Sequence, residues 1–205
     1  DEMSSRGLGD VYKRQGGVAG SIWLCDRHIR SHVNRYYPSI PGELSNMRLL
    51  KRLKKANTPA KMKHLMNWYG PYLGAGIRID HIAENWQSVS VSMKQHWYNI
   101  NAVGTHFGGS LYAMVDPHYM LMLMRILGPD YVVWDKAAAI NFVKPGKGKV
   151  SATMTISDDE IGRIIQATAG GDKDLPVYHL TITDESGETV AEVDKTLYIR
   201  KKKNA

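Results

Sequence analysis

The stretch GTHFGGSLYAMVDPHYMLMLMRILG, residues 104–128, contains the pattern that decides the fold of this chain. Two adjacent glycines precede an apolar run that is interrupted once by a carboxylate, Asp116, which is followed directly by Pro117. A helix that is apolar on nearly every side has to be covered all round. A sheet that curls around the helix provides this cover, so we expect one long central helix over 110–127 inside a curled sheet. Because proline has no N–H, Pro117 should kink this helix beside Asp116.

Strand patterns flank this helix on both sides. Before it, residues 77–85 and 88–99 alternate apolar and polar side chains, as half-buried strands do. The inward positions are Ile77, Ile79 and His81 in the first strand and Val89, Val91 and Met93 in the second. After the helix, four segments rich in Val, Ile, Thr and Tyr are strand candidates: 131–145, 149–157, 176–188 and 189–202. The expected order is two strands, the long helix, and four strands.

The connections between these elements carry turn and capping signals. PGKGK at 145–149 and ESGE at 185–188 predict hairpin turns. GPYLGAG at 70–76 predicts a turn-rich hinge before the first strand. Between the fourth and fifth strands, residues 158–171 predict a short helix with an acidic first turn and a glycine end.

Composition and charge limit the class of protein. A chain of 205 residues with 43% hydrophobic residues can form one globular domain with a core. The net charge of +7 belongs to the ends, because residues 47–63 carry seven Lys/Arg and residues 200–203 four more, whereas residues 64–199 carry ten Lys/Arg against fifteen Asp/Glu. This mildly acidic body disfavours a nucleic-acid-binding module. The single cysteine excludes an internal disulfide, and no apolar run reaches the roughly 20 residues of a membrane span, so we expect a cytoplasmic protein.

The first 46 residues have no apolar periodicity, and we expect them to be a leader that is non-native or disordered. A coherent pattern begins at Met47, which is where we expect translation of the native gene to start. Cys25, His28 and His32 have metal-ligating side chains but no second ligand pair at zinc-finger spacing. No metal site is therefore predicted.

Residues 47–69 place Leu and Met on one face and Lys and Arg elsewhere, which predicts a pair of basic amphipathic helices. Such helices can form a lid that packs on the domain, or a basic surface for weak contact with anionic lipid or for an acidic partner. The main domain is expected over residues 70–200, and residues 201–205 form a basic tail.

The glycine pair and the aspartate together suggest a site for a carbonyl group. Adjacent glycines at a helix start leave the backbone N–H groups of Gly109 and Ser110 open to a ligand. Asp116 lies on the same side of the helix to within roughly 20° but about 10 Å further along the axis, so one carbonyl cannot contact both groups. Two copies of the helix packed antiparallel would bring the glycines of one copy against the aspartate of the other. The spacing therefore favours a homodimer with two sites at its interface.

The run N-x-x-G-T-x-x-G-G-x(6)-D, which ends in Gly108, Gly109 and Asp116, resembles the motif of the hotdog-fold thioesterases. Its first members here are Asn101, Gly104 and Thr105. The resemblance covers about residues 70–200 and implies an α+β hotdog fold, with an antiparallel sheet of about six strands wrapped around one long central helix. Related enzymes include acyl-CoA thioesterases of the phenylacetate pathway type. The stretches GTHFGGSLYAMVDPHYMLML, YVVWDKAAAINFVKPGKG and VAEVDKTLYIRKK look like a bacterial branch known mainly as a domain of unknown function.

The resemblance also implies roles for three residues. In the hotdog enzymes the aspartate acts as a nucleophile or as a general base on water, a glycine amide polarises the thioester carbonyl, and an asparagine orients water or substrate. The matching residues Asp116, Gly109 and Asn101 are expected to be catalytic. The implied substrate is a coenzyme A thioester, no cofactor is required, and the implied assembly is a homodimer, with a tetramer left open.

Two positions depart from the pattern of these enzymes. Many relatives have histidine immediately before the glycine pair, whereas this chain has Phe107 there and His106 one residue earlier. Some relatives have a hydroxyl residue one turn beyond the carboxylate, whereas this chain has Met120. The pocket should therefore be more apolar, and we expect Gly108, Ser110, His106 and Phe107 to contact the substrate.

Lys144 and Lys147, around PGKGK, could pair with the phosphates of coenzyme A, although lysines in a turn are often only solvated. The same stretch lacks the spacing of a nucleotide-binding P-loop. The first function hypothesis is an acyl-CoA thioesterase, and the second is a non-catalytic dimer that binds acyl chains or acyl-CoA. A hydratase or dehydratase ranks last, because it needs a second acid/base group facing Asp116 and the sequence offers no identifiable partner.

Overall fold

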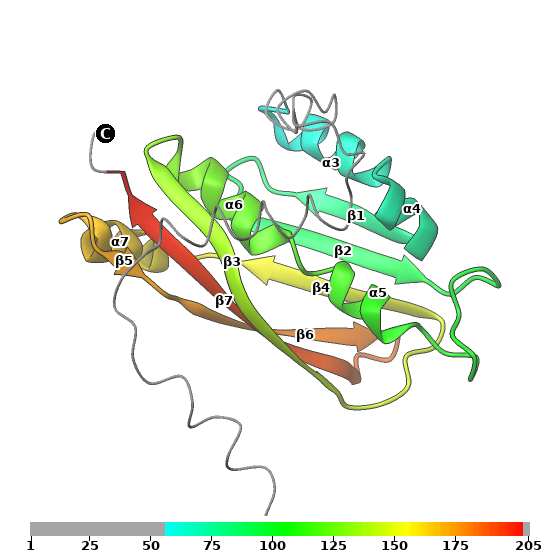
Figure 1. The fold of residues 1–205 in the computed structure, drawn as a ribbon. Coiled ribbons are helices and arrows are strands. Elements are labelled where there is room, and N and C mark those ends of the chain that lie inside the picture. Colours follow the sequence, from blue (N-terminus) through cyan, green and yellow to red (C-terminus); the bar gives the residue numbers. More distant parts are fainter. Residues whose placement is uncertain (1–55, 203–205) are drawn as a thin grey trace, which may run out of the picture. The chain divides into compact units, whose positions relative to one another are not determined.

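The structure is a computed structural model that describes residues 56–202 (Figure 1). The expected leader over 1–46 with Cys25, the first of the two basic helices and the end of the basic tail lie outside the described residues. None of the helices among the described residues is long and apolar enough to cross a membrane.

The described chain forms an antiparallel seven-stranded sheet whose order is β1-β2-β4-β6-β7-β3, with the short β5 paired to β7. The strands are β1 Ile77–Ile82, β2 Ser88–Lys94, β3 Tyr131–Phe142, β4 Lys149–Thr155, β5 Lys173–Asp174, β6 Val177–Asp184 and β7 Thr189–Lys201. Figure 1 shows α5 (Gly108–Ala113) and α6 (His118–Leu127) along one face of this sheet. The α+β class and the sheet that covers the central helical segment are confirmed.

The period-two pattern of the first two strands is confirmed except at one position. Val89, Val91 and Met93 of β2 are all buried, as expected. In β1 the register shifts between Ile79 and His81. Because of this bulge, His81 is exposed and Ile82 is buried in its place, so the prediction that His81 points inward is wrong.

The central helical segment consists of two shorter helices, so the prediction of one long helix is confirmed only in part. The residues 114–117 form a turn between α5 and α6, and Asp116 lies in this turn. Pro117 cannot donate a backbone hydrogen bond, which interrupts the helix at the expected place.

A buried histidine stabilises the turn between the two helices. His118 Nε2 lies 3.1 Å from the backbone oxygen of Met114 and 3.1 Å from the hydroxyl oxygen of Tyr72. Because a carbonyl oxygen only accepts, Nε2 carries the proton. Burial lowers the pKa of His118 to about 4, so the ring is neutral near pH 7.

Two connections differ from the sequence-based expectation. PGKGK at 145–149 does not close a hairpin, because β3 pairs with β7 whereas β4 pairs with β2 and β6. GPYLGAG does not form a hinge of turns but the helix α4 (Gly70–Ala75), which has a proline in its first turn and ends at Gly76 with φ 73°. The ESGE turn between β6 and β7 is confirmed, with Gly187 N–H donating to the Asp184 carbonyl.

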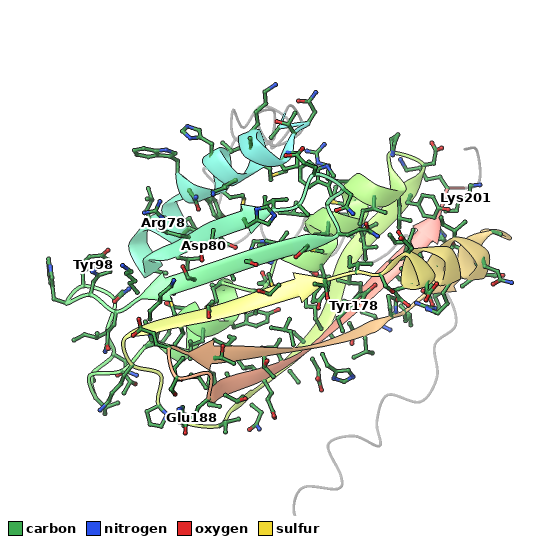
Figure 2. The ribbon with its side chains drawn as sticks, turned by 180° about the vertical axis from the view of Figure 1, so that it is seen from behind. Arg78, Asp80, Tyr98, Tyr178, Glu188 and Lys201 are labelled. Atoms are coloured by element: carbon green, nitrogen blue, oxygen red, sulfur yellow. The ribbon has the colours of Figure 1, made fainter. Side chains whose placement is uncertain are left out.

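The remaining helices are anchored by caps and by packing. Thr58 Oγ1 caps α3 (Pro59–Asn67), and the Asn67 side chain bonds both backbone groups of Ile79 in β1. Figure 2 shows α3 along the β1 side of the sheet. The predicted acidic helix is α7 (Asp158–Thr168), which begins after the cap residue Ser157. It packs beside β5 and β7, whereas α6 packs against β3.

Candidate functional site

Asp116 is held by two hydrogen bonds to one of its carboxylate oxygens. Oδ1 accepts from the hydroxyl of Tyr112 at 2.6 Å and from Nζ of Lys195 at 2.5 Å. Oδ2 has no hydrogen-bond partner among residues 56–202, and the Asp116 side chain is 42% exposed. One oxygen is therefore fixed by the protein, while the other is open to a water molecule.

Lys195 is the centre of this cluster. Besides Asp116, its Nζ lies 3.0 Å from the hydroxyl oxygen of Tyr112 and 3.2 Å from Oδ1 of Asp135. An ammonium group has three N–H donors, and the three acceptors match this number. The Lys195 side chain is only 3% exposed, so this full set of partners is what makes its burial tolerable.

Three elements bring these groups together. Tyr112 lies four residues before Asp116, which puts the two side chains on one side of the helical segment. Lys195 lies on β7 at an inward position between the buried Val193 and Leu197. Asp135 lies on β3 next to a bulge, opposite Leu197.

The protonation states follow from burial and from these contacts. Burial by itself lowers the pKa of Lys195, but the hydrogen bonds to Asp116 and Tyr112 outweigh this effect and raise the pKa above its usual value. Burial raises the pKa of Asp135, and the charge of Lys195 opposes this shift. Burial and the hydrogen bond to Asp116 raise the pKa of Tyr112, which remains a neutral donor. One ammonium thus faces two carboxylates.

The sequence-based reasoning missed Lys195, Tyr112 and Asp135, and the expectation that Asp116 has no identifiable partner is wrong. A signal for Lys195 exists, since β7 alternates apolar residues at every second position and Lys195 takes the place of one of them. The spacing of Tyr112 to Asp116 was also readable. No local signal marks Asp135, because the bulge that follows it in β3 is a tertiary feature.

The glycine pair begins α5 and is covered by two aromatic rings. A Cβ atom on Gly108 would lie 2.9 Å from the Phe142 ring, and one on Gly109 would lie 2.5 Å from the Phe107 ring. No hydrogen bond of the Gly109 N–H is found within the described part of the chain. The N–H of Ser110 instead donates to the Phe107 carbonyl at 2.9 Å. The backbone N–H groups of Gly109 and Ser110 were both expected to be open to a ligand. Of these two, only the N–H of Gly109 has no hydrogen-bond partner among the described residues.

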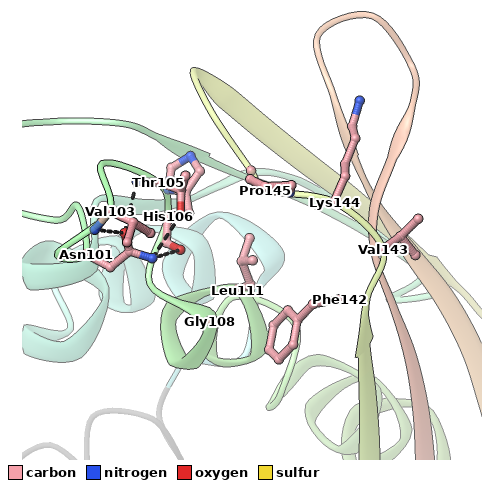
Figure 3. Close-up of a pocket in the computed structure, with 11 residues that line it drawn as sticks. Asn101, Val103, Thr105, His106, Gly108, Leu111, Phe142, Val143, Lys144 and Pro145 are labelled. Atoms are coloured by element: carbon pink, nitrogen blue, oxygen red, sulfur yellow. Dashed lines mark hydrogen bonds between the residues drawn. The ribbon is translucent and has the colours of Figure 1, made fainter.

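A pocket of about 420 Å³ lies beside the glycine pair (Figure 3). Gly108 and Leu111 of α5 form one wall, and the other walls come from the loop before α5 and from residues 142–146. Asp116 does not line this pocket. Within one chain, the structure thus brings Asn101, His106 and Gly108 together but leaves the carboxylate outside.

Asn101 fixes the loop that leads into α5 (Figure 3). Its Oδ1 accepts from the N–H groups of Val103 and Thr105, and its Nδ2 donates to Thr105 Oγ1 and to the His106 carbonyl. These four bonds use both donors and both lone pairs of the side chain. In this conformation Asn101 shapes the pocket wall rather than presenting a free donor to a ligand.

His106 fastens this loop to the connection between β3 and β4. Its ring Nε2 donates to the Gly148 carbonyl at 3.0 Å, and its backbone N–H donates to the Gly146 carbonyl at 3.0 Å. Burial lowers the pKa of His106, so the ring is neutral. Its Nδ1 is buried and has no hydrogen-bond partner within the described residues.

The two lysines expected to bind phosphate differ in their surroundings. Lys144 forms ion pairs with Asp184, which ends β6, at 2.6 Å, and with Glu188, which lies in the turn before β7. Figure 3 shows its side chain extending away from Gly108 and Leu111. Lys147 is exposed and forms no ion pair with another described residue. Of these two lysines, only Lys147 is therefore free to bind an anion.

No group of three or more His, Cys, Asp or Glu side chains suited to a metal ion occurs in the part of the chain that the structure describes. The described chain therefore offers a carboxylate with an open oxygen beside a buried ammonium, and, separately, a free backbone N–H at the start of α5.

Comparisons with known proteins concern the family and the fold of the chain. A family model described as "Domain of unknown function (DUF4442)" matches residues 59–199. A comparison with curated proteins finds no match.

Several solved structures are similar in fold. A protein of unknown function from Pseudomonas aeruginosa is 20% identical, with a TM-score of 0.62 over 68% of this chain and 93% of that chain. Thioesterase HI1161 from Haemophilus influenzae is 17% identical, with a TM-score of 0.53 over 70% of this chain and 91% of that chain. A protein of unknown function from Chlorobaculum tepidum is 15% identical, with a TM-score of 0.57 over 72% of this chain and 99% of that chain. At these identities the likeness concerns the fold, which is the hotdog fold.

Proposed function

Because the chain belongs to the DUF4442 family and has the hotdog fold, we propose that it is a thioesterase that hydrolyses acyl-coenzyme A esters with Asp116 as its base. The observation that carries this proposal is the state of the Asp116 carboxylate. Oδ1 is held by Tyr112 and Lys195, whereas Oδ2 is open in a half-exposed position. A carboxylate that is fixed at one oxygen and free at the other is suited to take a proton from water.

Hydrolysis of the thioester requires attack by water, stabilisation of the charge on the carbonyl oxygen and departure of the thiolate. Asp116 Oδ2 takes a proton from water as the water oxygen attacks the carbonyl carbon. The negative charge that develops on the carbonyl oxygen is stabilised by the N–H of Gly109 at the start of α5. The carbon–sulfur bond then breaks, and the thiolate takes the proton from Asp116, which restores the carboxylate. Attack by Asp116 itself, through a mixed anhydride that water then hydrolyses, is the alternative path to the same products.

The site requires a second copy of the chain, since Asp116 does not line the pocket beside Gly108 in one copy. The outer edge of β3 is unpaired among the described residues and carries Trp134, which is 64% exposed. A long, unprotected edge strand is a template for pairing with another chain. We propose that two copies meet along β3 and that each places its Asp116 near the glycine pair of the other.

The test is thiol release from short, medium, long and aromatic acyl-coenzyme A esters, with Asp116→Asn as the variant. Loss of a general base should lower kcat by about 10²- to 10⁴-fold. Asp194→Asn is the matched control, because Asp194 is an exposed carboxylate of β7 whose contact is with His179. Equal activity of the wild type and Asp116→Asn would refute the role of Asp116.

A non-catalytic acyl-binding protein is the second candidate. It is favoured by the two exposed phenylalanine rings that cover the glycine pair, Phe107 and Phe142. Under this alternative, acyl-coenzyme A binds to the wild type and to Asp116→Asn with similar affinity, and neither protein releases thiol.

A further inference from the structure

Lys195 occupies a position where an apolar residue would be expected. Its neighbours on the same face of β7, Val193 and Leu197, are fully buried, and Lys195 itself is 2% exposed. Burying an ion pair is costly, and apolar side chains of similar volume often replace such a pair without loss of stability. The lysine is therefore not explained by packing alone.

We propose that Lys195 is a positioning residue for hydrolysis, whose ammonium fixes the Asp116 carboxylate through Oδ1 and so directs Oδ2 toward the attacking water. This inference rests on the proposed function and adds a residue to it. Lys195 Nζ is 2.5 Å from Asp116 Oδ1 and reaches it from β7, so the sheet fixes the carboxylate of the helix turn. Tyr112 donates to the same oxygen, so the carboxylate has little freedom to rotate.

The Lys195 ammonium contacts a second carboxylate, Asp135, and therefore does not serve Asp116 exclusively. Asp135 Oδ1 lies 3.2 Å from Lys195 Nζ, so one positive charge is shared by two carboxylates. The two carboxylates and the ammonium together therefore carry a net negative charge beside the open oxygen of Asp116. A lysine that served only Asp116 would stabilise its charge more and make it a weaker base.

The other titratable groups around Asp116 do not supply a second cation. Tyr112 is a neutral donor on the helix side, and Tyr72 and His118 lie behind the turn, where burial keeps the histidine neutral. Lys195 is thus the one ammonium that contacts Asp116 within the described chain. A change in the Asp116 charge state on removal of Lys195 can be assigned to this contact.

The experiment compares the full chain with its Lys195→Met and Lys195→Arg variants. The readouts are the acid limb of the kcat/KM profile and the midpoint of the Asp116 carboxyl titration, followed by ¹³C NMR and assigned with Asp116→Asn. Lys195→Met should move both to higher pH by about one unit or more, since an opposite charge at this distance shifts a carboxyl by roughly 1–3 units. Lys195→Arg should restore most of the wild-type profile.

Arg163→Met is the matched control. Arg163 also bridges two carboxylates, Glu160 and Asp174, but it lies on α7 outside the site. Its removal should leave the acid limb in place. A folded Lys195→Met protein with an unchanged titration midpoint and an unchanged acid limb would overturn the inference.

A second variant covers the case in which Lys195→Met does not fold. Asp135→Asn leaves Lys195 to Asp116 alone, so the Asp116 midpoint and the acid limb should both move to lower pH. An Asp135→Asn midpoint equal to that of the wild type would also overturn the inference. If the wild type hydrolyses no ester, the proposed function fails, whereas the carboxyl titration still decides whether Lys195 controls Asp116.

Discussion

Lys195 Nζ donates a hydrogen bond to Asp116 Oδ1 over 2.5 Å, although the two residues are 79 positions apart in the sequence. The contact joins β7 to the turn between α5 and α6, which is the part of the helical segment that Pro117 interrupts. The break in the helix therefore puts a carboxylate at a place where a core lysine of the sheet can reach it. Asp135, from β3, joins the same ammonium.

Removal of the Tyr112 hydroxyl should reduce activity without unfolding the protein. Tyr112→Phe deletes one of the two donors to Asp116 Oδ1, while Lys195 still holds that oxygen. We expect kcat to fall by about tenfold and the free energy of unfolding to change by about 1 kcal/mol. Tyr178→Phe is the control, because Tyr178 lies opposite Lys195 in the pairing of β6 with β7, but its hydroxyl donates to Glu160 of α7 and not to Asp116. An equal loss of kcat in both variants would argue against a special role for Tyr112.

His118 should make the protein less stable in acid. Its pKa is about 4 in the folded protein against 6.5 as the ordinary value, so the unfolded chain binds more protons between these pH values. The free energy of unfolding contributed by the neutral ring is present above about pH 6.5 and is lost as the pH falls toward 4, by about 3 kcal/mol in total. Urea unfolding at pH 7.5 and pH 4.5 should show a smaller difference for His118→Gln than for the wild type. The same difference in both proteins would contradict the assignment.

A methyl group on Gly109 should disturb the aromatic cover of the glycine pair. The new Cβ would lie 2.5 Å from the Phe107 ring, whose exposed side chain can swing away. We therefore expect Gly109→Ala to change the melting temperature little and to raise KM for acyl-coenzyme A. The double variant Gly109→Ala/Phe107→Ala should recover part of the lost affinity, since the clash is then absent. Failure of this rescue would place the defect at the Gly109 amide instead.

A charge on the open edge of the sheet should separate the proposed dimer. Ala139 is exposed on β3, opposite Asp194 of β7. Ala139→Asp places one carboxylate per copy along the edge, and like charges on an edge strand oppose pairing. Sedimentation velocity should show a dimer for the wild type and a monomer for the variant, and thiol release should fall with the dimer. Activity that persists in a monomeric variant would refute the shared site.

The two lysines near PGKGK should respond differently to substitution. Lys147→Gln removes an exposed lysine without an ion pair in the described region, so we expect KM for acyl-coenzyme A to rise a few-fold and to depend less on salt. Lys144→Gln removes the partner of Asp184 and Glu188, so its main effect should be on the turn between β6 and β7. Steady-state kinetics at two salt concentrations distinguish the two outcomes.

Much of the fold was predictable because it is encoded in local patterns. The alternation of Val89, Val91 and Met93 and the proline at 117 each act on their own segment, and the structure confirms both. The errors arose where neighbouring strands decide the outcome. The bulge that turns His81 outward exists only in the register of β1 with β2, and PGKGK fails to close a hairpin because β3 pairs with β7.

The sequence by itself determined the fold class, the break beside Asp116 and the small residues at the start of α5, because each depends on a residue type and its near neighbours. Only the tertiary structure decided the surroundings of the carboxylate. Lys195 is adjacent to Asp116 because β7 places it on the inward face of the sheet, and Asp135 reaches the same ammonium from the neighbouring strand. Contacts between residues this far apart are set by strand register and helix docking, which no local pattern contains.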